Sequence, residues 1–296
     1  MTHLDQRLAA LSPEQRAQLA LRLKRKVDAS AELPSSHLAV YSESRFEPFA
    51  LTDLQQAYWL GRTDAFALGG IASRAYLEFE IPALDVPRME LAWNALVRRH
   101  DMLRVVVGND GKQRVLLEVP EYRIAVHDLR AATAAEQTEQ LETVHQEMFR
   151  SLRPASEWPL FELRASLLPN GVGRLHMVQD VLNADGGSAA ILFRELAELY
   201  KDPERVLPVL DLTFRDYVMH ERDREARPEY ERAKRYWMDR LADIPPAPDL
   251  PLARLPAAIG ARGGAATGSG ARSTASTGVP IVGLRFSSGR NGDGMP

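Results

Sequence analysis

The chain has 296 residues, of which 45% are hydrophobic and 26% charged, and it carries a formal net charge of −3 at pH 7 with no cysteine. This composition is typical of a soluble globular protein, no apolar run reaches the roughly 20 residues that cross a membrane, and the slightly acidic balance gives no reason to expect nucleic acid as a partner. The absence of cysteine excludes disulfides and thiolate nucleophiles and favours a cytoplasmic protein. The histidines lack paired ligand spacing, so we do not expect a metal site.

Residues 1–48 are predicted to form a helical leader followed by a linker. Ser12, Pro13 and Gln15 combine an N-cap, a proline at the first helical position and the last residue of a capping box. Residues 29–48 are polar and contain prolines and serines, which favours an irregular connector. The leader is either a solvated helix or a docking segment.

The segment 49–62 is predicted to contain a short helix with its caps. Thr52 is placed to cap the helix with Gln55 three positions on, and Gly61 is placed to end it. Arg62 follows the helix. An arginine in this position is more often a surface residue than a functional one, unless a buried carboxylate pairs with it.

Strands and helices then follow one another in a mixed order. Alternating apolar and polar residues predict strands, a 3.6-residue apolar period predicts helices, and Asp110-Gly111 and Asn170-Gly171 are hairpin turn pairs. The predicted strands span residues 74–81, 105–107, 113–119, 122–126, 161–167 and 172–179, and the predicted helices span 86–100, 141–152, 188–200, 213–223 and 228–241. Because this order lacks regular βαβ alternation, it indicates an α+β fold with a mixed sheet and flanking helices.

Two carboxylates, Asp180 and Asp185, lie where the last predicted strand gives way to a helix. Gly186-Gly187 lets the backbone turn sharply there, and the N-terminus of the helix favours negative charge. A carboxylate in this position is a candidate for proton transfer, or else it fixes the turn. Ser188 is expected to cap the helix.

Four stretches together resemble the heterocyclization domains of nonribosomal peptide synthetases, a branch of the condensation-domain superfamily. FALTDLQQAYWLGR (49–62), RHDMLR (99–104), DVLNADGGS (180–188) and IPPAPDLPL (244–252) are similar to the family motifs FPLTxxQxAYxxGR, RHxMLR, DxxxxDxxS and LPxxPxLPL. The matched positions include Thr52, Gln55, Tyr58, Gly61, Arg62, His100 and Arg104. Ala50 and Ile244 depart from the pattern. Ordinary condensation domains carry HHxxxDG instead, and Asp180 and Val181 stand at its two histidine positions.

The resemblance implies a chloramphenicol-acetyltransferase-like architecture of two lobes, of which residues 49–254 would supply the N-terminal lobe and the second lobe is missing. It implies a domain that joins a carrier-bound acyl group to carrier-bound cysteine, serine or threonine and closes a thiazoline or oxazoline ring, as in siderophore or other secondary-metabolite synthesis. The resemblance implies no directly bound cofactor, because the partners would be carrier proteins that bear phosphopantetheine. Because the chain starts at Met1, the upstream carrier protein is expected in trans. By the same resemblance Asp180 faces the chemistry, and Asp185 forms a buried ion pair with Arg62 or, as second choice, Arg104.

Residues 255–296 differ in character from the rest. After residue 255 the chain holds 10 of its 19 glycines and one acidic residue, Asp293, a composition that favours disorder. The tail is either a natural linker or an out-of-frame translation. Without a second lobe, the polypeptide is expected to be inactive alone and to self-associate through exposed apolar surface.

Two other functions compete with this interpretation. One is a non-catalytic module that binds carrier proteins, which the missing lobe favours. The other is an acyl-CoA-dependent acyltransferase of the same superfold, which is disfavoured because those enzymes use the histidine that Val181 replaces.

Overall fold

The computed structural model describes residues 42–63, 70–151, 153–245, 273–274 and 280–290. Residues 1–41 of the predicted leader and linker lie outside this part. The main sheet has six strands in the order β5-β6-β7-β2-β9-β8, and β5 and β6 are parallel whereas the other neighbours are antiparallel. Its strands are β2 (Ile71–Pro82), β5 (Ala125–Asp128), β6 (Phe161–Leu167), β7 (Val172–Asp180), β8 (Ser273–Thr274) and β9 (Pro280–Arg290). The predicted α+β class with a mixed sheet is confirmed.

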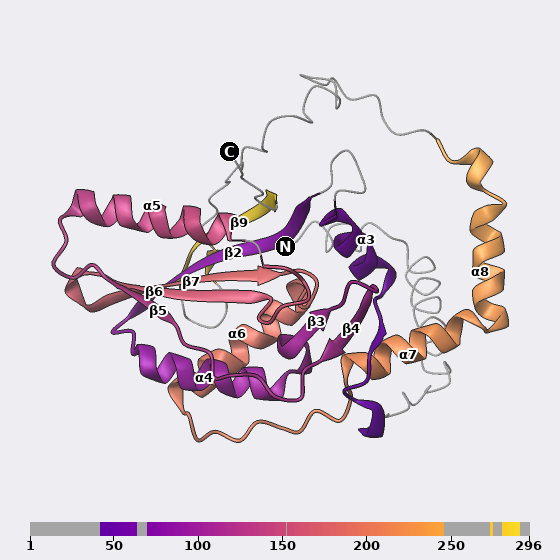
Figure 1. Cartoon of the computed structure of the whole chain (residues 1–296), viewed down its shortest axis with the longest axis horizontal. Helices are drawn as coiled ribbons and strands as arrows, with labels where there is room; N and C mark the ends of the chain where they lie inside the picture. The colour runs from indigo at the N-terminus through magenta and orange to yellow at the C-terminus, as the bar shows by residue number, and fades with distance from the viewer. Residues whose placement is uncertain (1–41, 64–69, 152, 246–272, 275–279, 291–296) are drawn as a thin grey trace, which may run out of the picture. The chain divides into compact units, whose positions relative to one another are not determined.

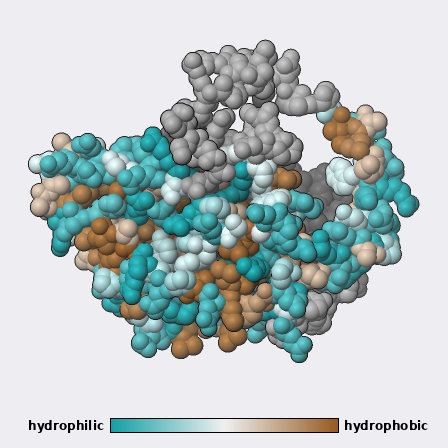
Figure 2. All heavy atoms as spheres, viewed as in Figure 1, coloured by the Kyte–Doolittle hydropathy of each residue, from teal (hydrophilic) through white to brown (hydrophobic). Residues whose placement is uncertain are grey.

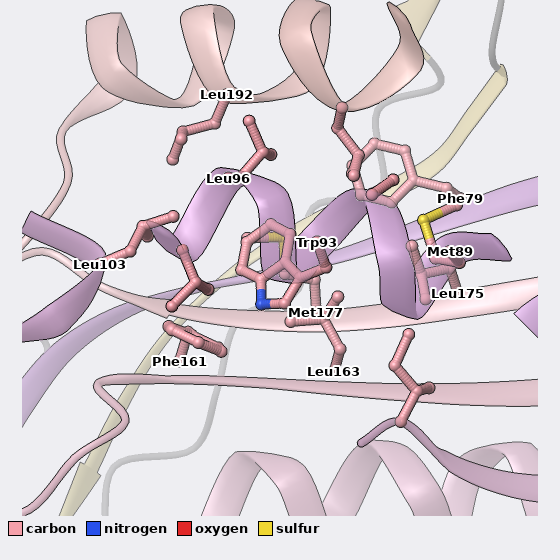
Figure 3. Close-up of a cluster of buried hydrophobic side chains, with 14 of the residues drawn as sticks. Phe79, Met89, Trp93, Leu96, Leu103, Phe161, Leu163, Leu175, Met177 and Leu192 are labelled. Carbon is pink, nitrogen blue, oxygen red and sulfur yellow. The ribbon is translucent and has the colours of Figure 1, made fainter. Parts of the chain in front are cut away.

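One face of this sheet carries the main hydrophobic core. Leu77, Met177 and Leu163 lie opposite one another on β2, β7 and β6, and they pack with side chains of α4 (Val86–Arg99) and α6 (Gly186–Lys201). Trp93 of α4 is fully buried there, and its ring meets Phe161 edge-on at 5.0 Å between centroids (Figure 3). The apolar stripe predicted for the helix over residues 86–100 therefore forms the centre of the core.

The opposite face of the sheet is covered by α5 (Ala134–Arg150), as Figure 1 shows. Since side chains alternate along a strand, Tyr76 and Val178 point away from the main core, and they pack with Val144 and Met148 of α5. The polar groups of Glu78, Ser166 and His176 share this face, so the sheet lies between an apolar layer and a partly polar one.

A second, three-stranded sheet has the order β1-β4-β3, with β1 at Phe49–Ala50, β3 at Val105–Val107 and β4 at Lys112–Val115. Gly111 has a φ of 70° in the β3–β4 turn, a conformation that glycine adopts without strain. The predicted hairpin is confirmed, although β4 ends at Val115 and not at residue 119. Next to this sheet, α3 (Asp53–Gly61) ends with Arg62 as its C-cap.

Two further helices follow α6: α7 (Phe214–Glu225) and α8 (Pro228–Met238), with a short 3-10 turn at Leu241–Asp243. Both were predicted from the sequence. None of the helices within the described residues has the length and apolar character that crossing a membrane requires.

The tail departs from the prediction. Strand β9 pairs with β2 in antiparallel register from Ile71↔Arg290 to Phe79↔Ile281, and β8 pairs with β9. The expectation of disorder was therefore wrong for residues 273–274 and 280–290. The rest of the tail, 255–272, 275–279 and 291–296, lies outside the described residues.

Candidate functional site

The turn between β7 and α6 is held by side chains from distant parts of the chain. The Gln55 side-chain amide donates to the carbonyl of Leu182 at 2.7 Å. Leu182 itself is 1% exposed and packs in a small core with Leu51 and Val105. From the segment after α4, the carbonyl of Met102 accepts a hydrogen bond from the Asn183 amide at 3.1 Å. The signature stretch 180–188 is thus positioned by the two preceding motifs.

Asp180 closes β7 and forms a buried ion pair. Its Oδ2 accepts from the Arg62 guanidinium, and its Oδ1 accepts from the backbone N–H of Leu182 at 3.0 Å. The side chains of Arg62 and Asp180 are 8% and 5% exposed. Arg62 also donates to the carbonyl of Arg153 at 2.8 Å. The carboxylate is therefore oriented through both of its oxygens.

The predicted ion pair of Asp185 was wrong. Asp185 is exposed and caps α6, with its Oδ1 accepting from the N–H of Ser188 at 2.7 Å. The hydroxyl of Ser188 donates to the same oxygen at 2.7 Å, so Ser188 supports the cap and is not itself the N-cap. These hydrogen bonds, from the backbone first, lower the pKa of Asp185. Arg62 pairs with Asp180 because that carboxylate, at the strand end, is the buried one.

The alternative partner, Arg104, is also committed elsewhere. Its Nη2 donates to Asp101 at 2.8 Å and its Nε donates to the carbonyl of Leu116 at 3.1 Å. Arg104 is 6% exposed and binds the backbone at the end of α4. Arg104 therefore holds the RHDMLR segment together and does not pair with Asp185.

His100 lies away from the turn and joins α4 to α6. Its Nε2 is 2.7 Å from Oε2 of Glu195, to which Arg99 also donates at 2.9 Å. Burial alone would raise the pKa of Glu195, but its bonds to Arg99 and His100 hold it below the ordinary value.

The remaining motif positions build α3. Thr52 and Gln55 form the predicted capping box, Gly61 is the last helical residue, and Tyr58 packs against the small core that holds Leu182. Gln55 therefore has two functions, because its oxygen closes the cap while its amide binds the turn.

Two buried polar residues were missed from the sequence. Gln113 is fully buried and donates to Gln55 and to the carbonyl of Ala50, each at 2.9 Å. Arg74, opposite Asp180 on β2, is 6% exposed and donates to the carbonyls of Ser151 and Phe149 at the end of α5. The signal available in the sequence was a polar residue at a strand position. The alternation of apolar and polar residues does not by itself show whether such a polar side chain is buried or faces solvent.

A small pocket lies beside the Asp180 carboxylate. Arg62, Arg74, Pro159, Phe161 and Val178 line it together with Asp180. Burial lowers the pKa of Arg74, and the charge of Asp180 opposes that effect. An oriented carboxylate that borders a pocket is a candidate for proton exchange with a molecule bound there. No cluster of metal-ligating side chains occurs in the described part of the chain.

Comparison with known proteins gives one consistent result. The sequence profile described as the condensation domain matches residues 48–265. The pyochelin synthetase PchF of Pseudomonas aeruginosa is 38% identical over 251 residues, which are 81% of this chain and 13% of that protein. The phenyloxazoline synthase MbtB of Mycolicibacterium paratuberculosis is 34% identical over 245 residues, which are 80% of this chain and 20% of that protein.

A solved structure is similar over a larger share. The cyclization-docking bidomain of the nonribosomal peptide synthetase EpoB from Sorangium cellulosum matches with a TM-score of 0.74 and 33% identity, covering 84% of this chain and 49% of that one. The chain thus spans a fifth or less of these two curated relatives and about half of the solved bidomain.

Proposed function

Since the chain belongs to the condensation-domain family and corresponds to the N-terminal part of a cyclization-type member, we propose that it contributes to peptide-bond formation and ring closure on carrier proteins. The complete domain would condense a carrier-bound acyl group with carrier-bound cysteine, serine or threonine. It would then expel water to leave a thiazoline or oxazoline.

The position of Asp180 carries this proposal. A family site with two histidines would offer an imidazole as base, whereas this chain has Asp180 and Val181 at those positions. The carboxylate of Asp180 is held by Arg62 and by the N–H of Leu182. Amide formation from a thioester needs mainly the alignment of two tethered substrates. Ring closure also needs protons moved onto the departing oxygen and off the nitrogen, which an oriented carboxylate can do.

The substrates would arrive on phosphopantetheine arms of carrier proteins, so the chain itself needs no bound cofactor for this chemistry. The name of one relative, phenyloxazoline synthase, states an oxazoline product for that protein. The choice among cysteine, serine and threonine is open for this chain.

The test compares the 296-residue chain alone with a chimera in which a cyclization-type C-terminal half follows residue 254. Each protein is incubated with loaded carrier proteins, and mass spectrometry detects the condensed thioester and the product that is one water lighter. We expect no product from the chain alone and both products from the chimera. In the chimera, Asp180→Asn should slow ring closure by about 100-fold or more, because the amide accepts no proton.

Asp185→Asn is the matched control, because an asparagine oxygen keeps the helix cap. It should cyclise like the unsubstituted chimera. Ring formation at an unchanged rate in a folded Asp180→Asn chimera would refute the role of Asp180. Cyclised product from the chain alone would refute the need for a second half.

A second candidate is a module that binds carrier proteins without turnover. In that case carrier proteins would bind the chain alone, and Asp180→Asn would leave their affinity unchanged.

A further inference from the structure

Arg74 is a buried cation of the pocket and lies outside the four family motifs. It is directly opposite Asp180 in the pairing of β2 with β7, and it lines the pocket together with Arg62 and Asp180. A guanidinium at 6% exposure is costly unless its charge and its donors are satisfied. The groups that Arg74 binds therefore indicate what it does.

The guanidinium of Arg74 binds the C-terminal end of α5. Its two terminal nitrogens donate to the carbonyls of Phe149 and Ser151. The last carbonyls of a helix have no partner within the helix, and they carry the negative end of the helix dipole. A side chain of β2 thus fixes the point at which the chain leaves α5.

This end of α5 is also the end that the sheet holds. The buried side chains of α5 are Val144, His145 and Met148, which all lie in its second half. Most of its other side chains are exposed, and the hydrophilic surface that they form is seen at the upper left of Figure 2. The contact between α5 and the sheet is therefore concentrated where Arg74 binds.

The segment that follows α5 leads directly to the candidate site. Two residues beyond Ser151, the carbonyl of Arg153 accepts a hydrogen bond from Arg62 at 2.8 Å. The other terminal nitrogen of Arg62 donates to the Asp180 carboxylate. The Arg62 guanidinium thus lies between a carbonyl of this segment and the carboxylate of the site, so a shift of the segment would turn Arg62 away from Asp180.

The backbone around Asp180 has supports of its own. The N–H of Asp180 donates to the carbonyl of Leu160 at 3.1 Å, and the N–H of Val181 donates to the carbonyl of Ser73 at 3.2 Å. These bonds do not involve the Arg74 side chain. Loss of its guanidinium should therefore change the direction of the Asp180 carboxylate and leave the path of β7 unchanged.

We propose that Arg74 is a positioning residue for Asp180, and that it acts through the segment after α5 and through Arg62. Arg74 fixes two carbonyls at the start of this segment, the segment presents a third carbonyl to Arg62, and Arg62 orients the carboxylate. The consequence for ring closure rests on the proposed function, whereas the effect on the geometry does not. The competing interpretation is that Arg74 only anchors α5 to the sheet.

Arg88 offers a matched control for that interpretation. It donates to the carbonyl of Lys201 at the end of α6 at 2.7 Å, and like Arg74 it has an Nε that makes no hydrogen bond with the described residues. It belongs to α4 and is not among the residues that line the pocket. Arg74→Met and Arg88→Met therefore each remove an arginine from the end of a helix, but only the first removes it beside the site.

The first measurement is spectroscopic and uses the full 296-residue chain. The chain is labelled with 15N-arginine, the guanidinium signals of Arg62 are identified by their loss in Arg62→Lys, and their hydrogen exchange with water is followed by NMR. Arg74→Met should speed this exchange by at least about tenfold, because the bonds of Arg62 open more often. Arg88→Met should leave the exchange of Arg62 unchanged.

Arg74→Lys is the conservative variant. It keeps a cation but replaces the planar fork by a single nitrogen, so the exchange of Arg62 should lie between the wild-type and Arg74→Met values and exceed the wild-type value about threefold or more.

The second measurement uses the chimera described above. Arg74→Met should slow ring closure by about tenfold or more, because a small misplacement of a catalytic group is costly, and the preceding condensation step should keep its rate. Arg74→Lys should recover part of the loss. The Arg88→Met chimera should cyclise like the unsubstituted one.

Wild-type exchange of Arg62 in a folded Arg74→Met chain would overturn the proposal, and so would equal effects of Arg74→Met and Arg88→Met on ring closure. Circular dichroism checks the fold. If Arg74→Met does not fold, wild-type exchange in Arg74→Lys overturns the proposal in its place. Faster exchange of Arg62 in Arg74→Met, together with unchanged ring closure in Asp180→Asn, would refute the proposed function and leave the positioning role intact.

Discussion

At the scale of single residues, the Arg62–Asp180 pair decides the geometry of the turn. Both side chains are almost fully buried, and separating two charges in such a place leaves one of them uncompensated, at a cost of about 3–5 kcal/mol. The ion pair therefore fixes the conformation of the turn and also contains the carboxylate of the candidate site. Arg62 positions Asp180, and through Asp180 it positions the N–H of Leu182.

A second polar network lies on the α5 face of the sheet. His176 is fully buried, with Nδ1 2.8 Å from the Tyr76 hydroxyl and Nε2 2.9 Å from the Ser166 hydroxyl. The Tyr76 hydroxyl also donates to Glu78 at 2.8 Å. Burial would raise the pKa of Glu78, but its bonds to His176 and Tyr76 and the charge of Arg174 lower it to about 2.

This network predicts acid sensitivity. Because the folded state lowers the pKa of Glu78 from 4.5 to about 2, its contribution to stability is present above pH 4.5 and is lost as the pH falls through that interval. The free energy of unfolding of the wild-type protein should decrease as the pH falls from 5 to 2. In Glu78→Gln this decrease should be smaller by about 1–2 kcal/mol, after allowance for solvent screening. Urea unfolding at several pH values measures this. Glu118→Gln, at an exposed position, should keep the wild-type slope, and an identical slope for Glu78→Gln would contradict the prediction.

At the scale of elements, helix caps organise the site. Capping boxes begin α3, α5 and α7, and Asp185 caps α6. Gln55 of the α3 capping box also binds the turn, so a local signal that starts a helix also positions a long-range contact. Asp185 is by contrast a local residue, which accepts hydrogen bonds from the backbone N–H and the hydroxyl of Ser188 in the first turn of α6.

The role of Asp185 predicts a modest effect of its removal. Asp185→Ala should lower the free energy of unfolding by about 1 kcal/mol, the usual cost of losing an N-cap side chain. Asp185→Asn should be close to wild type because its oxygen still accepts the Ser188 N–H. Chemical denaturation of the three proteins measures the difference. A loss of about 3 kcal/mol or more for Asp185→Ala would instead indicate a buried ion pair.

At the scale of the whole molecule, the strand β9 extends the main sheet beyond β2. Its segment 280–290 follows a glycine-rich stretch, yet Val282, Leu284 and Phe286 alternate with Gly283 and Arg285, which is a strand period. With β9 in place, β2 is paired on both sides. The low-complexity composition obscured this short pattern.

Hydrogen exchange tests the pairing of β9. Backbone amides within 280–290 should exchange at least about tenfold more slowly than an unstructured chain, because ladder hydrogen bonds must open first. The irregular residues 204–210, whose Val206 is 91% exposed, provide the fast-exchanging reference. Equal rates in the two segments would show that the tail is unpaired in solution.

The sequence by itself determined the α+β class, the capping box of α3, both hairpins and the family motifs. These follow from local signals: apolar period, capping residues and Asx-Gly turns lie within a few positions of the structure that they predict. Only the tertiary structure decided which carboxylate Arg62 binds. Asp180 and Asp185 are both far from Arg62 in the sequence, and they differ in burial, which the sequence does not show. The partners of Gln55, Arg104 and Arg74 were likewise set when distant segments packed, since a buried polar group binds whatever group the fold places beside it.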